Sequence, residues 1–209
     1  MRRTVLSIVA VALACTLCTS AAAQPAVSVR GNVGAAFFQA PEGLSNVLNS
    51  GVDVGVGAGV HVRGGLEVVV QGGYDRFTLN GDTFALLRGD TPSSIRVDGG
   101  ALNVINGSLG LRYTLRTQGD AQPYATAGLG LYHTRLESLD VGGGATRYPR
   151  LSATRWGYHA ALGLRFRIDE TYRFFFEPRY VSIDTRETEL DTSTPTRYVT
   201  LRLGIDVSL

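Results

Sequence analysis

Hydrophobic and polar residues alternate strictly over the last twelve residues of the chain, from Tyr198 to Leu209. Every second position is aliphatic, namely Val199, Leu201, Leu203, Ile205, Val207 and Leu209. A period of two is typical of a β-strand with one apolar and one polar face. Such a strand has an open edge unless another strand pairs with it, and pairing with the first strand of the chain would close a barrel.

The same alternation recurs from Ala26 onward and predicts seven earlier strands. They are expected at residues 27–37, 52–63, 66–75, 105–115, 125–132, 156–167 and 174–180. Long connections follow the first, third, fifth and seventh strands, whereas short turns follow the second, fourth and sixth. An even strand number with long loops at one end and short turns at the other is typical of outer-membrane barrels. The sequence therefore predicts an all-β fold, an eight-stranded antiparallel up-and-down transmembrane β-barrel.

The first 23 residues form a different kind of segment. Two arginines precede an apolar core from Val5 to Cys18, and three alanines ending at Ala23 follow. This pattern predicts a signal peptide over 1–23 that is cleaved before Gln24, leaving one barrel domain over 24–209. Both cysteines of the chain would leave with the signal, so we expect no disulfide or thiolate metal site in the mature chain.

Composition and charge exclude several classes of protein. The 20 basic residues exceed the 18 acidic ones by two, and the two arginines of the predicted signal account for that excess. A mature chain without a basic excess gives no reason to expect nucleic acid as a partner. The chain is 44% hydrophobic, which argues against disorder, and no second long apolar run follows the first, which argues against a helical membrane protein.

Alternation alone does not decide which face of the strands points inward. With the aliphatic face inside, the chain would be a soluble, lipocalin-like periplasmic barrel that binds a small apolar ligand. With the polar face inside, the glycines of that face make room in a narrow lumen. These glycines are Gly55, Gly57, Gly59, Gly128, Gly130, Gly157 and Gly163. The glycines and the unequal connections favour the membrane barrel.

Outward aliphatic faces place ten charged residues in the lumen. They are Arg30, Asp53, Arg63, Glu67, Arg112, Arg165, Glu177, Arg179, Arg202 and Asp206. In a ring too narrow for continuous water these charges are expected to pair and to plug the lumen. Strand direction predicts that Glu177 reaches Arg179 or Arg202. It also predicts that Glu67 lies beside Arg63 and Arg112, and that Asp206 lies low on the strand adjoining Arg30.

Two further features bear on the strands. Seven aromatic residues near strand ends suit girdles at the two membrane interfaces. They are Tyr74, Tyr113, Tyr124, Trp156, Tyr158, Tyr172 and Tyr198. Pro178 cannot donate a ladder hydrogen bond, so a local bulge is expected there.

An enzyme is a third possibility, because some small barrels modify lipid A with a serine nucleophile and a histidine base at the lipid-facing rim. The histidines are His61, His133 and His159; two are on the predicted lumen face, and no serine is near His133 in sequence. The acidic run from Asp184 to Asp191 does not follow a calcium-loop pattern. We therefore expect no catalytic residue, no cofactor and no metal site.

Three stretches carry a resemblance to a known family: PYATAGLG at 123–130, WGYHAALG at 156–163 and FEPRY at 176–180. Over its mature length the chain resembles the small eight-stranded proteins grouped with OmpA and OmpX as outer-membrane beta-barrel domains. The resemblance implies a monomer in the outer membrane of a Gram-negative-type bacterium, inserted by the barrel-assembly machinery and surrounded by outer-membrane lipids. It also implies a non-enzymatic role in envelope structure or in surface interaction through extracellular loops. It names no surface ligand.

Overall fold

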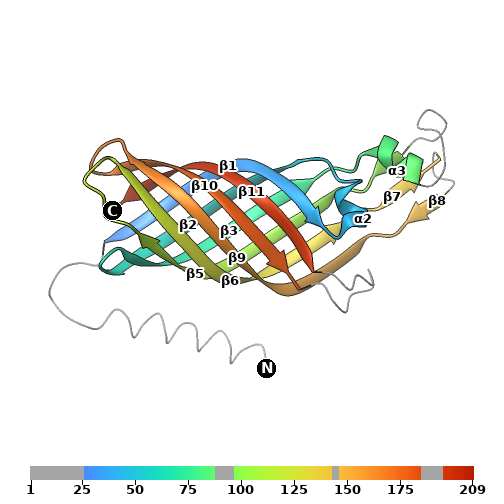
Figure 1. Cartoon of the computed structure of the whole chain (residues 1–209). Coiled ribbons are helices and arrows are strands. Elements are labelled where there is room, and N and C mark those ends of the chain that lie inside the picture. The colour runs from blue at the N-terminus through green and yellow to red at the C-terminus, as the bar shows by residue number, and fades with distance from the viewer. Residues whose placement is uncertain (1–25, 88–96, 143–145, 185–194) are drawn as a thin grey trace, which may run out of the picture.

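The computed structural model describes residues 26–87, 97–142, 146–184 and 195–209, and its main feature is a closed antiparallel barrel (Figure 1). The barrel strands are β1 (Val27–Ala40), β2 (Gly51–Arg63), β3 (Leu66–Phe77), β5 (Leu102–Thr114), β6 (Ala121–Leu136), β9 (Leu151–Arg167), β10 (Tyr172–Ile183) and β11 (Thr196–Ser208). β1 pairs with both β2 and β11, so the sheet has no free edge. The predicted eight-stranded barrel is confirmed. The expected signal peptide lies outside the described residues.

The two ends of the barrel differ in their connections. β1 begins and β11 ends at the same end, where the Leu209 amide donates to the Val27 carbonyl at 2.8 Å. Short turns lie at this end. The β2–β3 turn places Gly64 and Gly65 at positive φ, 61° and 97°, a conformation that L side chains rarely adopt. We call this the turn end and the opposite one the loop end.

The loop end carries short additional elements. α2 (Glu42–Ser45) follows β1, and α3 (Gly81–Leu87) follows β3. A three-stranded sheet of β4 (Val97–Gly99), β7 (Leu139–Val141) and β8 (Thr146–Tyr148) stands beyond the barrel (Figure 1). In the described part of the chain no helix is long and apolar enough to cross a membrane. Residues 185–191 of the acidic run lie outside the described residues.

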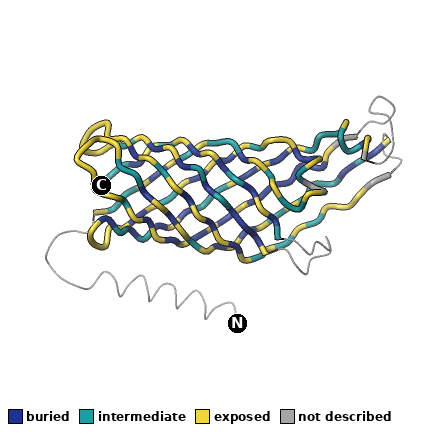
Figure 2. The backbone as a smooth tube through the Cα atoms, viewed as in Figure 1, coloured by how far each residue is buried: buried dark blue, intermediate teal, exposed yellow. Residues whose placement is uncertain are grey.

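The aliphatic face of every barrel strand points outward. Val56, Leu129 and Leu162 are 67%, 65% and 69% exposed, and Figure 2 shows exposed and buried residues alternating along the strands. This is the orientation of a barrel surrounded by lipid. It is the opposite of the orientation that a lipocalin-like barrel requires.

The aromatic girdle is smaller than the sequence predicts. Tyr124 and Tyr198 face the lumen and are only 3% and 0% exposed. Side chains alternate between the two faces of β6 and β11, and both tyrosines occupy positions that point inward. The other five aromatic residues of the predicted girdle face outward.

The expected bulge at Pro178 is absent. The pairing of β9 with β10 keeps one register from Phe176–Leu164 to Arg179–Ala161, and only the pairs of Glu177 and Pro178 between them are missing. Because proline lacks the N–H, the ladder is interrupted without a shift.

Candidate functional site: the lumen

Nine of the ten charged residues predicted for the lumen are buried there, and each residue is at most 8% exposed. The exception is Arg63, which is exposed. Its predicted place in the lumen is wrong because the β2–β3 ladder shifts register between His61 and Arg63, so that Arg63, the last residue of β2, pairs with the outward residue Leu66.

The turn-side half of the lumen holds two carboxylates and two arginines. Glu67 Oε2 lies 2.8 Å from Arg112 Nη1 and 3.5 Å from Arg165 Nη2. Asp206 Oδ2 lies 3.6 Å and 3.3 Å from the same two nitrogens. Ser28 donates a short hydrogen bond to the other oxygen of Glu67. Each guanidinium group is therefore shared between two carboxylates.

Glu177 is the centre of the next layer. Its Oε2 accepts a hydrogen bond from the Tyr124 hydroxyl at 2.9 Å and from Arg30 Nη1 at 3.3 Å. Its Oε1 lies 4.0 Å from Arg202 Nη1. Arg30 also stacks over the ring of Phe175, with the guanidinium carbon 4.0 Å from the ring centroid. Glu177 is thus held by two cations and one hydroxyl.

The layer nearer the loop end contains two aspartates on directly opposed positions of β2 and β3, Asp53 and Asp75. The Asp53 carboxylate accepts hydrogen bonds from Arg202 Nη2 at 2.5 Å and from Asn32 Nδ2 at 2.6 Å. Asp75 instead accepts from the Tyr198 hydroxyl at 2.9 Å. Sequence reasoning places Asp75 on the polar face but leaves it out of the network.

The ion pairs observed in the lumen match only part of those predicted from the direction of the strands. The structure contains the Glu177–Arg202 and Glu67–Arg112 contacts. Asp206 is the register partner of Arg30 on the adjoining strand, yet its ion pairs run across the lumen to two other arginines. Arg179 is 2% exposed, and its Nε and Nη2 atoms have no hydrogen-bond partner among the described residues.

An apolar cluster, which we call the cap, fills the lumen at the loop end. Its buried members are Ala36, Leu48, Phe77, Leu102, Val104, Tyr132, Val181, Ile183 and Tyr198. Phe77 packs edge-on against Phe38 and against Tyr198, with ring centroids 5.5 Å apart in both pairs. The lumen therefore has two parts, an apolar cap and a charged network below it.

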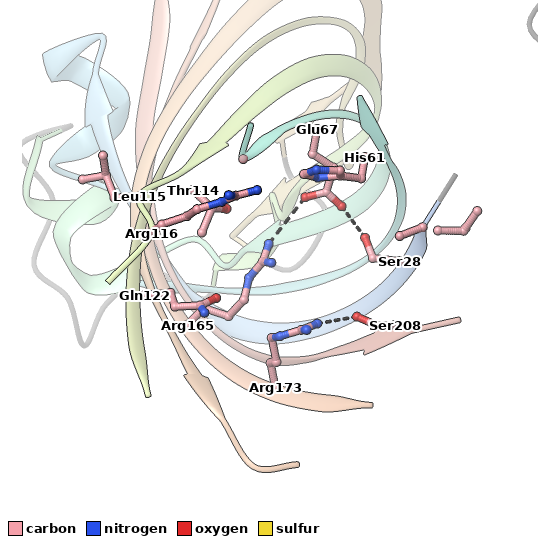
Figure 3. Close-up of a pocket in the computed structure, with 13 residues that line it drawn as sticks. Ser28, His61, Glu67, Thr114, Leu115, Arg116, Gln122, Arg165, Arg173 and Ser208 are labelled. Carbon is pink, nitrogen blue, oxygen red and sulfur yellow. Dashed lines mark hydrogen bonds and ion pairs between the residues drawn. The ribbon is translucent and has the colours of Figure 1, made fainter. Parts of the chain in front are cut away.

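At the turn end the network borders a pocket of about 320 Å³ (Figure 3). The residues that line it include Ser28, His61, Glu67, Arg165, Arg173 and Ser208. Arg173 donates a short hydrogen bond to the Ser208 hydroxyl. The pocket is thus a vestibule whose inner wall is formed by the ion pairs of Glu67.

With this geometry established, comparison with known proteins identifies the family. The model of the outer membrane protein beta-barrel domain matches residues 7–203. The chain belongs to this family. An outer-membrane location follows, and with it the contact of the outward aliphatic faces with lipid.

Solved structures of low sequence identity share the fold. Neisserial surface protein A is 17% identical, with a TM-score of 0.59, over 87% of this chain and 96% of its own. Ail, the attachment invasion locus protein of Yersinia pestis, is 10% identical, with a TM-score of 0.52, over 90% and 100%. The N-terminal barrel domain of Pseudomonas aeruginosa OprF is 14% identical, with a TM-score of 0.52, over 89% and 98%. Comparison with curated proteins finds no match.

Two of the three histidines of this outer-membrane barrel contact hydroxyl groups of residues other than serine, and the third, His61, is exposed and lines the vestibule together with Ser28. On the outer wall His133 Nδ1 lies 2.8 Å from Thr154 Oγ1, and in the lumen His159 Nδ1 lies 3.5 Å from the Tyr132 hydroxyl. Within the described ranges no group of three or more His, Cys, Asp or Glu side chains could hold a metal ion. The site is therefore best described as an array of buried ion pairs beneath an apolar cap.

Proposed function

We propose that this protein is a non-enzymatic outer-membrane barrel with a closed lumen, acting in envelope structure or surface interaction through its extracellular loops. The observation that carries the proposal is the two-part filling of the lumen. A solute would have to displace the buried aromatic pair Phe77 and Tyr198 and then separate the ion pairs of Glu177 and Glu67. Breaking buried ion pairs costs several kcal/mol each, so spontaneous opening is rare.

The loops are the parts of the chain that reach beyond the membrane. β4, β7 and β8 form a small sheet outside the barrel, and Leu139 and Val141 of β7 are buried within this extension. A loop with a packed sheet presents a fixed surface at lower entropic cost than an extended chain. This extension is therefore the proposed contact surface for a partner outside the cell.

Planar-bilayer recording tests the closed lumen. We expect the purified barrel to insert without a steady large conductance. A channel of porin-like conductance in the wild-type protein would overturn the closed-lumen part of the proposal.

A complementation experiment tests the role of the loops. A strain lacking the gene is supplied either with the full chain or with a chain shortened at 138–148, and envelope integrity and binding to surface ligands are compared. We expect the shortened barrel to restore envelope integrity while failing to restore surface binding. Full restoration of both by the shortened chain would show that the β7–β8 extension has no role in recognition.

A further inference from the structure

The vestibule at the turn end is built by the whole barrel. Each of the eight barrel strands contributes at least one residue to its lining, from Ser28 on β1 to Ser208 on β11. The short turns of outer-membrane barrels face the periplasm, so the vestibule lies on the periplasmic side. Because the sheet is closed, the lining positions are fixed relative to one another, and a fixed site binds a ligand at a lower entropic cost.

The vestibule has the size of a small-molecule site. Its volume is about 320 Å³. Pockets that bind small molecules have volumes of about 300–1,000 Å³. A space at the lower end of this range suits a small organic molecule.

The lining of the vestibule has an excess of positive charge. Among the described residues that line it, the one carboxylate is that of Glu67, and both of its oxygens have partners. Ser28 donates to Oε1, and two arginines of the network contact Oε2. Arg116 and Arg173 also line the vestibule, and neither takes part in an ion pair found among the described residues. Two guanidinium groups are therefore left for an anion.

The carboxylates close to these two arginines have other partners or lie outside the lining. Asp206 is the register neighbour of Arg173, but its ion pairs run to Arg112 and Arg165. In the turn before β10, Asp169 accepts hydrogen bonds from the backbone amides of the two residues that precede Arg173. The positive charge of the vestibule is thus not cancelled by its surroundings.

Hydrogen bonds hold both arginines at the mouth of the barrel. Arg173 donates to the Ser208 hydroxyl, and a guanidinium group has five N–H donors, so further donors remain. Arg116 belongs to the β5–β6 turn, where the Thr117 hydroxyl donates to the Ala121 carbonyl at 2.6 Å. In Figure 3 the side chains of the two arginines lie around one space.

The inner wall of the vestibule adds a buried donor. Arg165 lines the vestibule and is 8% exposed, and its Nη2 is shared between Glu67 and Asp206. Its Nε has no hydrogen-bond partner among the described residues. A buried donor without a partner is costly, and an acceptor that enters the vestibule along Arg165 would remove this cost.

We propose that the vestibule binds a small organic anion from the periplasm, with its phosphate or carboxylate group between Arg116 and Arg173. Guanidinium groups bind both kinds of oxyanion through paired N–H donors. The hydroxyl of Thr114 and the amide of Gln122, which also line the vestibule, offer hydrogen bonds to the rest of the molecule. This site goes beyond the proposed envelope role, and it depends neither on the extracellular loops nor on the closure of the lumen.

Calorimetric titration of the folded barrel in a non-ionic detergent, at constant ionic strength, tests the inference. The probes are glycerol 3-phosphate and succinate, and glycerol is the uncharged control. The variant is Arg116→Gln with Arg173→Gln, and the matched control is Arg76→Gln with Arg135→Gln, which removes two exposed arginines at the loop end.

We expect at least one of the two anions to bind the wild type, which identifies the preferred oxyanion, and glycerol not to bind. The variant should bind that anion at least tenfold more weakly, a difference of about 1.4 kcal/mol, because it loses charge-assisted hydrogen bonds. The control variant should bind like the wild type. Amide NMR shifts caused by the anion should be confined to the turn end.

Each alternative result overturns the inference. If neither anion binds the wild type, or if glycerol binds equally well, the vestibule is not an anion site. An unchanged affinity of the Arg116 and Arg173 variant excludes these residues, and an equal loss in the control shows a general charge effect. The gel-mobility shift between unheated and boiled samples establishes that each variant is folded. Arg116→Gln alone changes an exposed turn residue, and it should also weaken binding if the double variant does not fold.

Discussion

Replacing Glu177 by glutamine tests whether the ion pairs of the lumen hold the barrel together. Glu177 is 2% exposed and contacts Arg30 at 3.3 Å and Arg202 at 4.0 Å. Glutamine has nearly the same shape and can still accept the Tyr124 hydrogen bond, so the change removes charge and little else. Removing one partner of a buried ion pair costs about 3–5 kcal/mol, because the remaining charge is left uncompensated.

We expect the lower end of that range for Glu177→Gln, since Arg202 keeps Asp53 as a partner at 2.5 Å. A loss of about 3 kcal/mol in the free energy of unfolding corresponds to more than a hundredfold change in the folding equilibrium. Urea unfolding in detergent measures it, and the fluorescence of Trp156, the single tryptophan, reports the transfer from lipid-like surroundings to water.

The control is Glu170→Gln, the same chemical change on an exposed turn residue. Substitutions of this kind on the surface alter stability by about 0.5 kcal/mol or less. Equal urea midpoints for the two variants would refute the reasoning, because Glu177 would then contribute no more than a surface carboxylate. A second substitution, Arg30→Gln in the Glu177→Gln background, should cost less than it does in the wild type, since the pair has already been broken.

Three further predictions concern other parts of the chain. A Cβ at Gly163 would collide with the ring of Tyr124, so Gly163→Val should lower the urea midpoint, whereas Gly31→Val, where nothing lies within 4 Å, should change it little. A barrel shortened at 138–148 should still give the fast-migrating band of an unheated, folded barrel on a gel, because the ladder between β6 and β9 pairs Leu136 with Leu151 below the deletion. Loss of this band would show that the loop is needed for folding. Intact mass of the exported protein should place the mature N-terminus at or within a few residues of Gln24, and a retained, lipid-bearing cysteine would contradict this.

The barrel could be predicted from the sequence because its main determinant is local. In a strand the side chains alternate between two faces, so a run such as Val52 to Arg63 assigns each residue to a face without knowledge of its partners. The order of the strands follows from the general rule that strands consecutive in sequence are neighbours in the sheet, and the short turns enforce it for three of the pairs. The same reasoning fails where the register shifts near a strand end, as at Arg63, because the alternation of faces is broken there.

The contacts inside the lumen could not be predicted in the same way. The alternation of faces and the strand direction give the face and rough depth of a side chain, but long side chains in a narrow barrel reach partners beyond the adjoining strand. Arg30 therefore contacts Glu177, which lies two strands away, rather than its register neighbour Asp206. The sequence does carry a signal for the cap, because Phe77 and Val104 are apolar residues at inward positions near the loop end.

The separation of cap and network implies that stability and permeability respond to different residues. Glu177 lies below the cap, so its neutralisation leaves the packing of Phe77 against Tyr198 intact. The loop end should then stay closed to ions even in a barrel weakened by about 3 kcal/mol. Conversely, Phe77→Ala removes apolar packing at the loop end while the ion pairs of Glu67 still bridge Arg112 and Arg165 near the turn end. Under the proposed closed lumen, each part closes the barrel independently, so we expect an open pore only when both are removed.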